Sequence, residues 1–93
     1  MKLNFNNWNI LYDPYTDFLQ VYSPIFSNTN KKNIIKRERE NIKVVLDKKI
    51  GHPLLIEVSF AETLFKSNLE NWTKKQIFNF LENNLKGKYE KID

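Results

Sequence analysis

Hydrophobic and polar residues alternate along much of the first sixty positions, which is the pattern of β-strands with one buried face. Residues 42–47 show it most clearly, because Ile42, Val44 and Leu46 share one face. The run 54–60 repeats the pattern with four apolar side chains on one face: Leu54, Ile56, Val58 and Phe60. A short glycine-containing loop joins the two runs, so we expect them to pair as an antiparallel hairpin.

Two shorter apolar runs, 8–12 and 18–23, are separated by a turn signal at Asp13-Pro14. Proline presets φ for a turn, and the aspartate side chain can accept a backbone N–H within it. These runs predict a first hairpin. Residues 33–38 fit a short strand with a charged outer face, or a helix, so the sheet is expected to have four or five strands.

The C-terminal part has a helical pattern. Thr73 and Gln76 have the spacing of a capping box, in which each side chain accepts a hydrogen bond from the backbone N–H of the other residue. The apolar stripe that follows consists of Ile77, Phe78, Leu81 and Leu85. Gly87 is a suitable stop. The sequence therefore predicts a helix over 73–87 and leaves 61–72 as a connecting turn or a short helix.

The predicted architecture is a small α+β fold: an antiparallel sheet of two β-hairpins, covered on one face by the C-terminal helix. With 93 residues the chain has the length of a single domain. We divide residues 1–93 into the sheet at 8–60, the connection at 61–72 and the helix at 73–87.

The absence of cysteine excludes thiol nucleophiles, disulfides and thiolate metal sites, and it suits a reducing compartment. No stretch approaches the roughly 20 apolar residues that a membrane span needs. We therefore expect a cytoplasmic protein that does not bind a membrane.

The turn region also resembles a known family. The relevant residues are Tyr12, Asp13, Pro14, Asp17, Leu19 and Val21, followed by Asp47, Gly51 and the strand Ile56-Glu57-Val58. They are similar to the pattern of domain-of-unknown-function family 2283, over residues 8–60. The connection at 23–33 and the extension at 61–93 depart from that pattern. The resemblance implies a small prokaryotic β-hairpin domain of no established activity, some members being encoded beside toxin-like partners, and hence an antitoxin-like role.

Few residues suggest catalysis. His52 has no histidine or cysteine companions for a metal site and no visible triad spacing, so we interpret it as a loop residue. Asp13 and Asp17 supply too few oxygens for a hard cation and are expected to accept backbone N–H groups instead. Glu57 is expected to face solvent or to pair with a lysine across the ladder, such as Lys43. We predict no catalytic residues, no metal and no cofactor.

The net charge of +4 is concentrated in residues 31–52, where eight Lys and Arg face three acidic residues. The candidate binding residues are Lys31, Lys32, Lys36, Arg37, Arg39 and Lys43. Such a segment can track a phosphate backbone or bind an acidic protein. Interleaved glutamates, Glu38 and Glu40, also fit a solvated edge strand that is protected from aggregation.

Trp72 and Phe80 are the candidate partner surface, since Phe80 lies off the helical stripe and would mark an interface if it were exposed. The function predicted from the sequence is a non-enzymatic interaction module that binds a protein partner or itself as a homodimer. The alternative is nucleic-acid binding through residues 31–43.

Overall fold

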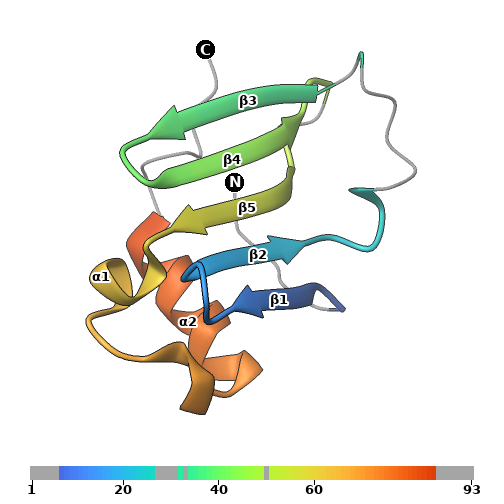
Figure 1. The fold of residues 1–93 in the computed structure, drawn as a ribbon. Coiled ribbons are helices and arrows are strands. Elements are labelled where there is room, and N and C mark those ends of the chain that lie inside the picture. The colour runs from blue at the N-terminus through green and yellow to red at the C-terminus, as the bar shows by residue number, and fades with distance from the viewer. Residues whose placement is uncertain (1–6, 27–31, 33, 50, 86–93) are drawn as a thin grey trace.

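The structure is a computed structural model that describes residues 7–26, 32, 34–49 and 51–85. Its centre is one five-stranded antiparallel sheet in the order β1-β2-β5-β4-β3 (Figure 1). The strands are β1 Asn9–Asp13, β2 Phe18–Tyr22, β3 Ile34–Arg39, β4 Ile42–Asp47 and β5 Pro53–Ser59. The helices are α1 Ala61–Phe65, the 3-10 helix η3 Leu69–Asn71 and α2 Lys74–Leu85. The predicted small α+β fold is confirmed.

Two locally connected units make up the sheet. Strands β1 and β2 form the predicted first hairpin, and β3, β4 and β5 follow one another as a meander. Segment 33–38, for which strand and helix were both open, is the edge strand β3 for most of its length. The two units meet along β2 and β5, where Phe18 pairs with Ser59 and Tyr22 with Leu55. We call this strand pair the seam.

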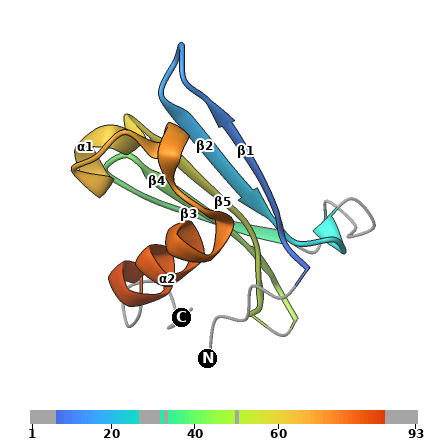
Figure 2. The same cartoon turned by 90° about the horizontal axis from the view of Figure 1, so that it is seen from below.

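Helix α2 lies against one face of the sheet, and no described helix covers the other face (Figure 2). The side chains between sheet and helix are almost all aliphatic or aromatic, as the alternation predicts. They include Leu19, Val21, Val44, Leu46, Ile56, Val58, Ile77 and Leu81. Burial of this apolar surface holds the layers together.

The predicted capping box fixes where α2 begins. The backbone N–H of Gln76 donates to the Thr73 hydroxyl at 3.2 Å, and the backbone N–H of Thr73 donates to the Gln76 side-chain oxygen at 2.7 Å. Each bond satisfies a donor that the first helical turn leaves unpaired. Gly87, the predicted stop, lies outside the described residues.

One strand residue was placed wrongly. Phe60 was expected on the buried face of the strand at 54–60, but β5 ends at Ser59 and Phe60 is 61% exposed. Its φ is 54°, in the left-handed region, because the chain turns there into α1. That turn breaks the two-residue alternation and directs the ring outward.

No helix within the described residues is long and apolar enough to span a membrane.

Candidate partner-binding site

The sheet has two edges, β1 and β3, and the described chain pairs no strand with the outer side of either. An edge strand leaves a row of backbone N–H and C=O groups that another strand can pair with. The side chains of the two edges differ, and this difference decides which edge is suited to binding.

Edge β3 carries four consecutive charged residues, Lys36 to Arg39, with alternating signs after the first two. Charged side chains on an edge strand oppose pairing with a further strand, since the incoming strand would bury them. The interpretation of this segment as a protected edge is therefore consistent with its position in the sheet.

The described basic residues among those proposed from the sequence do not all lie on one face of the sheet. Lys36 pairs with Val45, whereas Arg37 pairs with Val44, which belongs to the core below the sheet. Because successive side chains of a strand point to opposite faces, Lys36 and Arg37 lie on different sides of the sheet. Lys32 is exposed before the strand. Lys31 and the side chain of Arg39 lie outside the described part.

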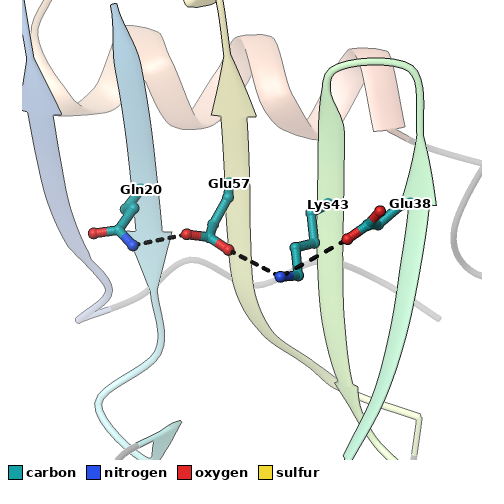
Figure 3. Close-up of polar contacts among 4 residues, drawn as sticks. All are labelled: Gln20, Glu38, Lys43 and Glu57. Carbon is teal, nitrogen blue, oxygen red and sulfur yellow. Dashed lines mark hydrogen bonds and ion pairs between the residues drawn. The ribbon is translucent and has the colours of Figure 1, made fainter. Parts of the chain in front are cut away.

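The positive charge of Lys43 is balanced by two carboxylates, those of Glu38 and Glu57. Its ammonium nitrogen lies 3.8 Å from a carboxylate oxygen of Glu38 and 3.8 Å from one of Glu57. The other carboxylate oxygen of Glu57 accepts a hydrogen bond from the Gln20 side-chain amide at 2.8 Å. These four side chains form a polar row across β2, β5, β4 and β3 on the uncovered face (Figure 3). The expected pairing of Glu57 with Lys43 is confirmed.

Edge β1 has no basic residue and no proline within it. Ile10 and Tyr12 pack against the core on the helix side, and Leu11 is 55% exposed on the uncovered face. The pairing of β1 with β2 runs without a bulge from Asn9 to Asp13. Within the described residues, β1 thus has no lysine, proline or bulge to oppose pairing, and its one charged residue is Asp13 at its end.

An open groove of about 630 Å³ runs beside β1 on the helix side. One wall is the strand itself, through Asn9, Ile10 and Tyr12. The other wall comes from η3 and the start of α2, chiefly Leu69, Trp72 and Ile77, with Glu70 and Lys74 also lining the groove. We call this combination, β1 with its groove, the β1 site.

A hydrogen-bonded link holds Tyr12, one of the residues that line the groove. The Tyr12 hydroxyl donates to Asp17 Oδ1 at 2.6 Å, and both carboxylate oxygens of Asp17 accept from the backbone N–H of Glu62 at 3.1 Å. Burial of the ring, aided by the Asp17 hydrogen bond and the nearby carboxylates, raises the pKa of Tyr12 above its usual value. A tyrosine hydroxyl is already protonated at neutral pH, and this shift extends the protonated state, in which the hydroxyl donates to Asp17, to higher pH.

The predicted partner surface, Trp72 and Phe80, has two parts with different roles. Phe80 is half-buried and stacked on Phe65 at 4.1 Å between ring centroids, so the exposure on which its proposed role depended is absent. Trp72 meets Phe65 edge-on at 5.2 Å, and its indole N–H donates to the Ser67 hydroxyl at 3.1 Å. Trp72 lines the groove, and the ring of Phe80 contacts the Trp72 ring edge-on, with 5.9 Å between ring centroids.

The remaining candidate side chains have structural roles. Asp13 accepts the backbone N–H of Tyr15 at 2.9 Å, as expected for the turn. His52 is exposed, and its carbonyl accepts the Asp47 N–H at 2.8 Å in the loop between β4 and β5. Within the described ranges, no group of three or more His, Cys, Asp or Glu side chains is placed to hold a metal ion.

Sequence reasoning did not propose Ile10, Leu11 or Tyr12 as binding residues; it named Tyr12 only for the family resemblance. The signal was three consecutive apolar residues in a short strand, which leaves apolar side chains on both faces. In comparisons with known proteins, no family model, curated protein or solved structure matches this chain. The resemblance to domain-of-unknown-function family 2283 stays a prediction.

Proposed function

We propose that this protein is a non-enzymatic interaction module that binds a protein by strand addition at the β1 site. The observation that carries the proposal is the edge of β1, which has no charged residue from Asn9 to Tyr12, next to an open groove. Its lining includes the apolar side chains of Ile10, Leu69, Trp72 and Ile77. In strand addition the main chain supplies hydrogen bonds, and pockets for alternate side chains supply selectivity. The β1 site offers both: an edge with which no described strand pairs, and a groove beside it for every second side chain of the incoming strand.

The placement of the basic residues disfavours the nucleic-acid alternative. Binding to a phosphate backbone needs several cations on one surface. Here Lys36 and Arg37 lie on opposite sides of the sheet, and Lys43 lies between two carboxylates. An antitoxin-like role, which the family resemblance implies, is compatible with strand addition, and a toxin-like neighbour would then provide the added segment.

The test is a selection of random peptides displayed on phage, with the immobilised protein as target. We expect enriched peptides to have alternating apolar residues, as a strand does when one face enters the groove. The decisive variant is Leu11→Lys, which places a charge on the edge at an exposed position. The matched control is Tyr15→Lys, which makes the same change in charge in the turn, where the side chain is 97% exposed.

Binding of the selected peptides should weaken at least tenfold in Leu11→Lys, about 1.4 kcal/mol, and remain unchanged in Tyr15→Lys. Thermal unfolding of both variants should match that of the parent, because neither change affects a buried side chain. Peptides that bind Leu11→Lys as well as the parent would place the binding surface elsewhere and contradict the proposal.

A further inference from the structure

The sequence of β1 is complementary to itself when two copies are placed antiparallel. A two-fold axis perpendicular to the sheet at Leu11 puts Leu11 opposite its own copy, Ile10 opposite Tyr12, and Asn9 opposite Asp13. This is the only two-fold register in which all five residues of the strand are paired. It sets apolar side chains against apolar ones and an amide donor against a carboxylate, which are favourable cross-strand pairs.

The faces of the sheet agree with this register. Ile10 and Tyr12 share the helix side in each copy, so the added strand would direct the same two side chains toward the groove. Leu11 lies on the uncovered face, where it is 55% exposed, and its counterpart would cover it. In Figure 1, β1 is the outermost strand at the lower edge of the sheet, and the orange segment that precedes α2 extends below it.

The other edge cannot pair with itself in this way. A two-fold axis at Lys36, Arg37 or Glu38 of β3 sets that charged residue opposite its own copy, and like charges directly opposite each other are destabilising. The registers centred on Lys36 and Arg37 are those that pair most of β3, and each has a charged residue at its centre because positions 36–39 are all charged. Self-pairing is thus favourable at β1 and unfavourable at β3.

We infer that the partner at the β1 site is a second copy of this chain, giving a two-fold symmetric dimer with one continuous ten-stranded sheet centred on Leu11. The inference rests on the proposed function, since it names the strand that is added. An interface of this kind is isologous: the same residues contribute from both subunits. The groove must take part, because stable interfaces bury on the order of 1,200–2,000 Å².

The first measurement is the mass in solution, by sedimentation and light scattering, across a concentration series. We expect the parent and Tyr15→Lys to approach twice the chain mass of 11.2 kDa as concentration rises, and Leu11→Lys to stay at the single-chain mass. A parent that keeps the single-chain mass up to millimolar concentration overturns the inference. A dimer that persists undiminished in Leu11→Lys overturns it as well, since its interface must lie elsewhere.

The second measurement tests the register. The chain has no cysteine, so Leu11→Cys introduces a single thiol. Opposite residues of antiparallel strands have Cα atoms about 4.5–5.5 Å apart, within the range that a disulfide spans. With oxidised glutathione as oxidant, Leu11→Cys should form disulfide-linked dimers at least tenfold faster than Tyr15→Cys, although position 15 is more exposed. Equal rates would contradict the register.

The two failures can be told apart. If the parent is a monomer while the selected peptides lose binding in Leu11→Lys, the β1 site binds a different protein: the inference is then wrong and the proposed function stands. If the parent is a monomer and no peptide depends on Leu11, both are wrong.

Discussion

Asp17 links the first hairpin to the helical part of the chain, and its replacement gives the sharpest test of how the β1 site is held. Its carboxylate accepts from the Tyr12 hydroxyl and from the Glu62 backbone N–H, and its own carbonyl accepts the Ala61 N–H at 3.0 Å. Its φ of 54° lies in the left-handed region, which aspartate tolerates better than alanine does.

Asp17→Ala should lower the free energy of unfolding by about 2–4 kcal/mol. Hydrogen bonds to a charged group contribute about 1.5–3 kcal/mol, and the value here belongs near the lower end because the carboxylate is only half-buried. The left-handed backbone adds about 1 kcal/mol for alanine. Asp17→Gly removes the same side chain without that backbone cost, so it should be about 1 kcal/mol less damaging than Asp17→Ala.

The assay is urea unfolding followed by tryptophan fluorescence, with linear extrapolation to water. Asp17→Asn keeps an acceptor and the tolerance for positive φ, and it should cost about 1 kcal/mol. A double-mutant cycle of Asp17→Asn with Tyr12→Phe should give a coupling of at least about 0.5 kcal/mol, since the two side chains are hydrogen-bonded. The reasoning is refuted if Asp17→Ala unfolds within 0.5 kcal/mol of the parent, or if the cycle shows no coupling.

Three further changes test other parts of the fold. Thr73→Ala should cost about 0.5–2 kcal/mol in urea unfolding, with Thr73→Ser close to the parent, because only alanine loses the hydroxyl that caps α2. Leu81→Ala should cost about 2–5 kcal/mol, because Leu81 is fully buried beneath the sheet; a loss under 1 kcal/mol would mean that α2 is loosely packed. Because folding raises the pKa of Tyr12, its protonated hydroxyl contributes stability that is fully present below the unfolded-state pKa of about 10. This contribution is lost as pH rises through the higher pKa of the folded state. The stability difference between parent and Tyr12→Phe should therefore shrink above about pH 10, and a constant difference would contradict the shift.

The features predicted correctly from the sequence depend on neighbouring residues. Alternation at 42–47 and the Asp13-Pro14 turn gave the strands and the first hairpin, and the spacing of Thr73 and Gln76 gave the start of α2. These signals are local because backbone periodicity and capping involve residues at most four apart.

The features that were missed depend on contacts distant in sequence. Asp17 was interpreted as a turn residue, yet it accepts a bond from Glu62, 45 positions away. Phe80 lies beside the helical stripe and packs because α1 brings Phe65 to it, which periodicity within α2 alone does not indicate. Alternation also divided the basic residues of β3 between two faces, which a count of charge along the chain does not reveal.

The seam between β2 and β5 has a consequence for how the chain folds. The hairpin β1–β2 and the meander β3–β4–β5 each form from contacts close in sequence, but the seam joins positions such as Gln20 and Glu57, 37 residues apart. Bringing such distant positions together costs conformational entropy before their contacts can stabilise the sheet. An isolated two-stranded hairpin is only marginally stable in water. We therefore expect the meander to form first and the hairpin to become ordered only on docking to β5. The edge proposed to bind a partner would then be the last strand of the sheet to acquire protection from hydrogen exchange.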